Sequence, residues 1–193
     1  MNRITLVDYI GYCDSKGEVT GHTAKTLKET KEMLSDSYDV SMVVTPPYAQ
    51  FFDDSCIASV LPYESSPQRQ SSKFKKIGLY IKKIRAVRNI VNNESTVWFV
   101  NTDFWLYVGL LFSKKKKRQK IFATNYLDFY SKKNLKNFIY NCAVKKINCV
   151  FHTNVELKRD KHQYVPDYWF DKRKYDKYFV KEKQKDVYIC GEI

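Results

Sequence analysis

Strand-like and helix-like segments alternate along the chain, and this alternation limits the possible folds more than any other feature. Runs rich in Val, Ile and aromatic residues are followed by segments whose apolar residues recur at helical spacing. The strand-like segments are Ile4–Ile10, Asp39–Val44, Cys56–Leu61, Thr96–Val100, Lys120–Thr124, Ile147–His152, Gln163–Val165 and Asp186–Gly191. The helix-like segments are Thr23–Leu34, Lys73–Val91, Phe104–Phe112, Lys133–Lys145 and Asp171–Lys183. The alternation predicts an α/β fold with a Rossmann-like open, mostly parallel sheet flanked by helices.

The composition fits one domain with a strongly basic surface. The 193 residues fall within the size of a single domain, and 44% of them are apolar, which is enough to form a core. The formal charge of +13 favours an anionic partner such as nucleic acid, a phospholipid surface or a phosphorylated ligand. A bias toward Lys, Asn, Ile and Tyr from an AT-rich genome is the alternative explanation of the charge.

The sequence predicts neither a metal site nor a membrane span. Its five cysteines, at positions 13, 56, 142, 149 and 190, include no C-x-x-C pair. The first ten residues include Asp8 and lack the small-residue cleavage site of a signal peptide. The longest apolar run, Phe104–Phe112, is about half of the roughly 20 residues that cross a bilayer. We therefore expect no metal or other cofactor and a cytoplasmic protein, soluble or peripheral at the inner face of the membrane.

Several catalytic motifs are missing from the sequence. There is no G-x-x-x-x-G-K-[ST], and the spacing of Gly11, Gly17 and Gly21 does not match G-x-G-x-x-G. Neither an Asp-x-Asp nor a G-x-S-x-G is present. These absences argue against a P-loop hydrolase, a dinucleotide-binding oxidoreductase, a metal-dependent GT-A sugar transferase and a serine hydrolase.

Polar clusters follow several predicted strands. They are the Gly11–His22 loop, Asn101-Thr102-Asp103, Thr124-Asn125-Tyr126 and His152-Thr153-Asn154. Open parallel sheets bind ligands at the carboxyl ends of their strands, so these clusters form the candidate site. Such groups suit hydrogen bonding to a sugar or another polyol. The alternative is that Asn and Asp simply favour the turns that end strands.

Five features occur in a recognisable order along the chain. They are the glycine-bearing loop with Gly17 and Gly21-His22-Thr23, the strand Val97–Val100 before Asn101-Thr102-Asp103, the segment Ile121–Asp128, the crossover-like Val165-Pro166-Asp167, and the strand-like Lys185–Gly191. This order resembles the N-terminal domain of retaining GT-B glycosyltransferases of the group 1/4-like kind, over essentially the whole chain. Asn stands at two positions where many members have His, and Asp167-Tyr168 stands where they have Asn-Gly.

The resemblance implies transfer of a sugar from a nucleotide-sugar to a glycan or lipid-linked acceptor in bacterial-type surface polysaccharide synthesis. It implies an acceptor-binding domain over residues 1–185 and the beginning of an otherwise missing donor-binding domain over residues 186–193. The acceptor-binding domain is expected to be inactive without the donor-binding domain. The implied acceptor-binding residues are Asn101, Thr102, Thr124, Asn125, Tyr126, Asp128 and Asn154, and the implied donor-phosphate loop comprises Gly17, Gly21, His22 and Thr23.

Two of these residues have alternative interpretations. Asp103 is the candidate for a catalytic base or an acceptor-positioning group because it is a carboxylate at a strand end, and the alternative is that it caps the helix Phe104–Phe112. His22 can contact a donor phosphate beside a helix N-terminus, or it can be an exposed loop residue.

The helix predicted over Lys73–Val91 is strongly basic. Its predicted apolar side consists of Phe74, Ile77, Ile81, Ile84 and Val91. The residues predicted to contact an anionic membrane from the other side are Lys75, Lys76, Lys82, Lys83 and Arg85. A core helix with a solvated outer side is the alternative. A non-catalytic basic module that binds nucleic acid or a partner protein is the competing function, although no RNP or helix-turn-helix motif supports a nucleic-acid partner.

Overall fold

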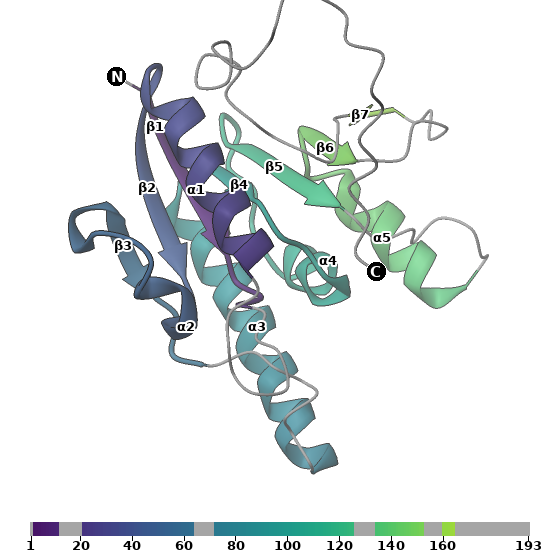
Figure 1. Ribbon diagram of the computed structural model, residues 1–193. Coiled ribbons are helices and arrows are strands. Elements are labelled where there is room, and N and C mark those ends of the chain that lie inside the picture. The colour runs from purple at the N-terminus through teal and green to yellow at the C-terminus, as the bar shows by residue number, and fades with distance from the viewer. Residues whose placement is uncertain (1, 12–20, 64–71, 126–133, 153–159, 165–193) are drawn as a thin grey trace, which may run out of the picture.

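Parallel strands form the centre of the fold (Figure 1). The computed structural model describes residues 2–11, 21–63, 72–125, 134–152 and 160–164. Within them lie the strands β1 (Asn2–Asp8), β2 (Tyr38–Val44), β3 (Ile57–Val60), β4 (Thr96–Phe99), β5 (Lys120–Asn125), β6 (Cys149–His152) and β7 (His162–Tyr164). The helices are α1 (Gly21–Ser35), α2 (Pro46–Ala49), the 3-10 turn η1 (Asp54–Cys56), α3 (Lys73–Asn93), α4 (Phe104–Leu111) and α5 (Leu135–Val144). The predicted α/β class is confirmed.

The strands form one sheet in the order β3-β2-β1-β4-β5-β6-β7, and every pair is parallel. The chain first runs outward from β1 through β2 to β3. Helix α3 then returns it to β4, on the other side of β1, and β5 to β7 continue in that direction. The strand order therefore reverses between β1 and β4. This is the topological switch point, the usual place for a ligand in an open α/β sheet.

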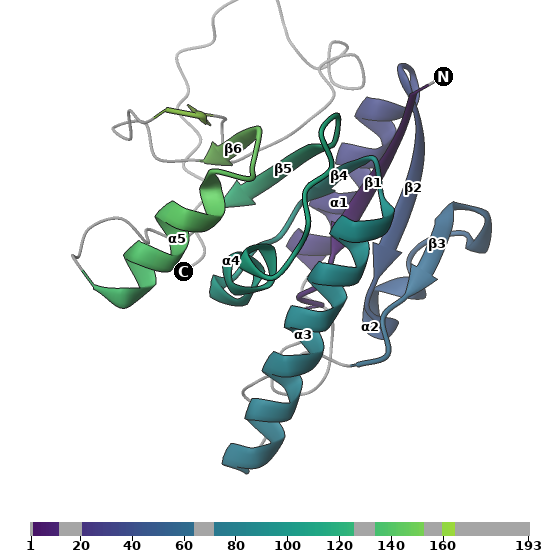
Figure 2. The ribbon, with the colours of Figure 1, turned by 180° about the vertical axis from the view of Figure 1, so that it is seen from behind.

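Helices lie on both faces of the sheet and bury two apolar clusters. Helix α1 covers β1 and β2 on one face (Figure 1), where Leu27 packs with Leu6 and Met42. Helices α3, α4 and α5 lie side by side on the opposite face (Figure 2). Successive strand residues point to opposite faces, so Val7 and Val43 belong to that second cluster. Burial on both faces explains the nearly continuous apolar runs in the strands.

The predicted apolar side of α3 was wrong for the first half of the helix. The buried residues are Leu79, Lys83, Ala86, Val87, Ile90 and Val91, whereas Phe74, Ile77 and Ile81 are 86%, 54% and 44% exposed. The first turns of α3 extend past the sheet (Figures 1 and 2), so only the second half decides which side faces the core. Lys83 is 1% exposed, which corrects its assignment to a membrane-contact surface.

The close contact of α3 with α4 depends on a glycine. A Cβ added to Gly109 would lie 2.7 Å from Cβ of Val87 and 3.3 Å from the carbonyl oxygen of Ile84. The absence of a side chain at Gly109 thus allows the two helices to approach closely.

Most element boundaries agree with the sequence-based expectation within two residues. Helix α1 begins at Gly21, two residues before its predicted start at Thr23, so Thr23 lies inside the helix rather than at its cap. The short helix α2 was not expected after β2, although Pro is favourable in a first helical turn. The predicted helix Asp171–Lys183, the strand Asp186–Gly191 and the domain boundary at 185 lie outside the described residues. No helix in the described part of the chain combines the length and apolarity needed to cross a bilayer.

Candidate functional site

The residues that follow β1 and β4 meet at the switch point and form a hydrogen-bonded polar cluster. We call Asp8, Tyr9, Lys83, Asn101 and Asp103 the switch-point cluster. Asp8 and Tyr9 come from the end of β1, Asn101 and Asp103 follow β4, and Lys83 reaches them from α3. Three separate segments of the sequence thus converge at the carboxyl edge of the sheet.

Asp8 joins the ends of the two central strands. Its side chain is fully buried, and Oδ1 accepts hydrogen bonds from the backbone N–H groups of Ile10 at 3.1 Å and Gly11 at 3.2 Å. Its Oδ2 accepts a hydrogen bond from Nδ2 of Asn101 at 2.9 Å. Burial raises the pKa of the Asp8 carboxyl, against the lowering effect of these donors. Asp8 and Asn101 therefore hold the turn after β1 against the turn after β4.

Asp103 caps α4 and binds Lys83. Its Oδ1 accepts hydrogen bonds from the backbone N–H groups of Trp105 at 2.8 Å and Leu106 at 3.3 Å, and from the hydroxyl of Tyr9. Its Oδ2 lies 2.9 Å from Nζ of Lys83. The helix-cap interpretation of Asp103 is therefore confirmed. A role as catalytic base stays a prediction, and a base with these contacts would first have to release its donors.

Tyr9 binds Asp103 from the end of β1. Its hydroxyl donates to Asp103 and accepts the backbone N–H of Asp103 at 3.1 Å, while Nζ of Lys83 lies 5.5 Å from the ring centroid. Burial, together with the negative charge of Asp103, raises the pKa of Tyr9 well above its ordinary value. The side chain thus acts as a neutral hydrogen-bond donor at physiological pH.

The turn after β1 approaches the end of β2 closely. Gly11 has φ +53°, a left-handed conformation that favours glycine, and an added Cβ would clash with the side chain of Thr45. Thr45 is fully buried, and its Oγ1 has no hydrogen-bond partner within the described part of the structure. A buried hydroxyl without a partner is unfavourable for stability, and this one packs against the turn after β1.

The ends of β4 and β5 are also joined by hydrogen bonds. The hydroxyl of Thr102 donates to the carbonyl oxygen of Thr124 at 2.7 Å, and Oγ1 of Thr124 accepts from Nε1 of Trp98 at 2.9 Å. The next strand ends at His152, which is 3% exposed and pairs in register with Asn125. Side-chain hydrogen bonds therefore connect the carboxyl edge from β1 through β4 to β5.

The structure brings together Asn101, Thr102, Asp103 and Thr124 from the predicted site. Asn101, Thr102 and Thr124 are buried and bound within the chain, so their observed contacts position the strand ends, and direct contact with an acceptor stays a prediction. Gly21, His22 and Thr23 form the first turn of α1, and Asn125 is the last residue of β5. The predicted residues Gly17, Tyr126, Asp128 and Asn154 lie outside the described residues.

Sequence reasoning missed three members of the cluster. Asp8 was included in a strand, although a carboxylate beside an apolar run is a recognisable signal of a strand end. Tyr9 has no distinguishing signal among the 15 tyrosines. Lys83 was assigned to the outer side of its helix because the neighbouring isoleucines suggested the wrong inward side.

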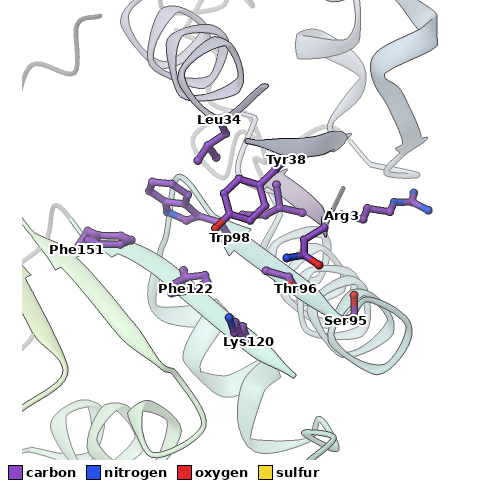
Figure 3. A pocket seen from close by; sticks show the side chains of 11 residues that line it. Arg3, Leu34, Tyr38, Ser95, Thr96, Trp98, Lys120, Phe122 and Phe151 are labelled. Atoms are coloured by element: carbon purple, nitrogen blue, oxygen red, sulfur yellow. The ribbon is translucent and has the colours of Figure 1, made fainter. Parts of the chain in front are cut away.

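An apolar hollow of about 380 Å³ lies at the opposite, amino edge of the sheet (Figure 3). Its floor contains the rings of Trp98, Phe122 and Phe151, and the centroids of Trp98 and Phe151 are 4.9 Å apart. Arg3 and Lys120 are the basic residues that line it. The hollow contains none of the switch-point cluster.

Comparisons with known proteins identify no family for this chain. No protein-family model matches the sequence, and no curated protein matches it either. Among the described residues, no three His, Cys, Asp or Glu side chains are grouped in a way that could hold a metal ion.

Proposed function

We propose that this chain is the acceptor-side domain of a GT-B sugar transferase. The reaction is transfer of a sugar from a nucleotide-sugar to a hydroxyl of a glycan or lipid-linked acceptor, in bacterial-type surface polysaccharide synthesis. The proposal includes a second domain that holds most of the donor, as in the enzymes that the sequence resembles.

The observation that carries the proposal is the polar carboxyl edge at the switch point between β1 and β4. Asp8, Asn101 and Asp103 fix the two turns that border this point, and rigid turns favour the binding of a ligand in one orientation. Turns that cross a sheet edge also present backbone N–H and C=O groups, which suit the many hydroxyls of a sugar.

The features of the site favour an acceptor over a complete donor. The turn after β1 lacks the G-x-G-x-x-G spacing that allows a backbone to approach a pyrophosphate closely. Lys83, the buried cation of the cluster, is bound to Asp103 and is not available to a diphosphate. Both points support a division in which this domain binds the acceptor and a second domain binds the donor.

Calorimetric titration of the full chain with UDP-glucose and GDP-mannose tests this division. Because the donor diphosphate is assigned to the second domain, we expect dissociation constants weaker than about 1 mM, equivalent to about 4 kcal/mol of binding free energy. A dissociation constant near 1 µM, which corresponds to about 8 kcal/mol, would show that this domain binds the donor and would refute the proposed division.

The variant Thr45→Val tests whether the acceptor binds beside the turn after β1. Valine removes the buried, unpartnered hydroxyl and nearly preserves the shape of the side chain, so the fold is expected to remain intact. We expect a lower affinity for a disaccharide, because loss of this hydroxyl changes the packing against the turn after β1. Thr96→Val, at the amino end of β4, is the matched control and is expected to leave the affinity unchanged.

A further inference from the structure

Helix α3 exposes a row of large apolar side chains, Phe74, Ile77 and Ile81, which we call the outer stripe. At about 100° per residue, the stripe lies on the opposite side of the helix from Leu79, Lys83 and Ala86, which face the core. Phe74 alone is 86% exposed. Three apolar neighbours on one exposed helix side form a continuous patch, and such patches are typical of interaction sites.

The outer stripe lies on a part of α3 that is accessible to a large flat partner. The first turns of the helix extend beyond the carboxyl edge of the sheet in both views (Figures 1 and 2). Gly78 lies among the stripe residues, and no heavy atom would come within 4 Å of a Cβ added there. A partner can therefore approach this side of α3 without displacing the described elements.

The charge around the outer stripe selects an anionic partner. Residues 73–93 contain no Asp or Glu, and the exposed basic residues of the helix are Lys73, Lys75, Lys82, Arg85 and Arg88. By helical geometry Arg85 and Arg88 continue the outer stripe toward the end of α3, while Lys75 and Lys82 lie along its border. The outer side of α3 is thus apolar at its start and cationic at its borders and end.

The geometry points to an anionic phospholipid surface as the partner of this side of α3. Interfacial helices insert an apolar side into the boundary between headgroups and acyl chains while basic residues bind anionic headgroups. Ile77 and Ile81 offer a single strand of nucleic acid neither an aromatic ring for base stacking nor a charge for its phosphates. The combination of aliphatic and cationic residues therefore favours lipid over nucleic acid.

Helix α5, which packs against α4 on the same face of the sheet, has a similar start. Leu135 and Phe138 are 72% and 66% exposed, and Lys136 lies between them in the sequence. Because α3 and α5 both run antiparallel to the strands on the same face, both begin at the carboxyl edge of the sheet. Membrane attachment at this end would place the switch-point edge near the lipid surface.

The lipid-binding surface shares no residue with the switch-point cluster. Lys83 faces inward and binds Asp103, whereas every residue of the outer stripe faces solvent. Lipid binding and ligand binding at the carboxyl edge can therefore succeed or fail independently in experiments.

Co-sedimentation of the full chain with vesicles tests the inference. The vesicles contain either phosphatidylcholine alone or phosphatidylcholine mixed with phosphatidylglycerol. We expect binding to the mixed vesicles only, and weaker binding when salt rises from about 0.1 M to about 1 M, since the Debye length falls from about 10 Å to about 3 Å. Equal binding to the two kinds of vesicle, or no binding to the mixed vesicles at low salt, would overturn the inference.

Matched variants locate the binding surface. Phe74→Ser with Ile77→Ser is expected to lower the partition coefficient on mixed vesicles at least about tenfold. Lys75→Gln with Lys82→Gln is expected to lower it about thirtyfold, since each basic residue near the surface contributes about fivefold. The control variants, Phe112→Ser and Lys117→Gln with Arg118→Gln, change exposed residues near the amino edge and should bind like the unchanged chain.

Two results with these variants would contradict a lipid partner. One is unchanged vesicle binding by both α3 variants. The other is a dimer of the unchanged chain, measured by sedimentation equilibrium, that is lost in Phe74→Ser with Ile77→Ser, because the outer stripe would then be an interface between copies of the chain.

Discussion

Nζ of Lys83 lies 2.9 Å from Oδ2 of Asp103, and this ion pair connects α3 to the N-cap residue of α4. Lys83 is 1% exposed, whereas the Asp103 side chain is 23% exposed. The pair thus fixes α3 against the turn after β4 at the edge of the switch point. Its partial exposure reduces its energetic contribution below that of a fully buried pair.

Replacement of Lys83 is expected to destabilise the protein. Lys83→Met leaves the Asp103 carboxylate without its cation, and we expect a loss of about 2 kcal/mol in the free energy of unfolding, measured by urea denaturation. In the double variant Lys83→Met with Asp103→Asn, the asparagine still caps α4, so the loss should be smaller than the sum of the single losses. The exposed neighbour provides the control, because Lys82→Met should change stability by less than about 0.5 kcal/mol. Additive losses in the double variant would show that the two side chains do not interact.

Asp8 is expected to make stability depend on pH. Burial raises its pKa in the folded state above the ordinary value of about 4, so the folded chain binds the proton more tightly than the unfolded chain. The stabilisation from this proton is complete below the ordinary pKa and is lost as pH rises through the raised pKa. Asp8→Asn removes this dependence, and a flip of the Asn101 amide preserves their hydrogen bond. The difference in unfolding free energy, variant minus unchanged chain, should therefore increase with pH above about 4. A difference that stays constant or decreases would contradict the buried, proton-binding state of Asp8.

Two glycines in neighbouring helices are expected to respond to alanine in opposite directions. Gly109→Ala places a Cβ 2.7 Å from Val87, so α3 and α4 must separate, and we expect a loss of about 1–3 kcal/mol. Gly78→Ala meets nothing within 4 Å and should stabilise the helix by about 0.5–1 kcal/mol. Thermal unfolding of the two variants under one condition provides the comparison. Equal changes would mean that the close contact of the two helices is absent in solution.

Cys56 is expected to be more reactive than Cys149. Nζ of Lys31 lies 2.7 Å from Sγ of Cys56 and lowers the pKa of its thiol, whereas burial raises the pKa of the Cys149 thiol. Iodoacetamide should therefore alkylate Cys56 before Cys149 near neutral pH, as measured by mass spectrometry of peptides. Lys31→Met should slow the reaction at Cys56 and leave the rate at Cys149 unchanged. Faster alkylation of Cys149 in the unchanged chain would contradict the Lys31 contact.

The sequence was sufficient for the fold because strands and helices differ in the spacing of their apolar residues. The runs around Leu6, Val43 and Trp98 predicted buried strands, and the polar residues after them predicted the carboxyl edge. Which side of α3 faces the sheet could not be predicted from the sequence. The first half of the helix carries an apolar side that contacts none of the described core. That side was assigned to the core, and Lys83 was consequently placed on the surface.

The internal contacts of the site were also beyond the reach of the sequence. Asn101 and Thr102 were expected to face a ligand, but their side chains bind Asp8 and the carbonyl of Thr124. Such pairings depend on strand register, which brings together Asn101 and Asp8 across 93 positions and Thr102 and Thr124 across 22, and leaves no local signal. The cap formed by Asp103, in contrast, was foreseen because it depends only on the next turn of the chain.

Backbone amide NMR tests the central claim, that the carboxyl edge at the switch point binds a sugar acceptor. The full chain is titrated separately with a panel of disaccharides and with UDP-glucose. We predict that disaccharides shift the amide signals of Gly11, Asn101 and Asp103, and that Thr45→Val weakens this response. Shifts confined to Trp98, Phe122 and Phe151 around the apolar hollow, or no shift with any disaccharide together with tight binding of UDP-glucose, would contradict it.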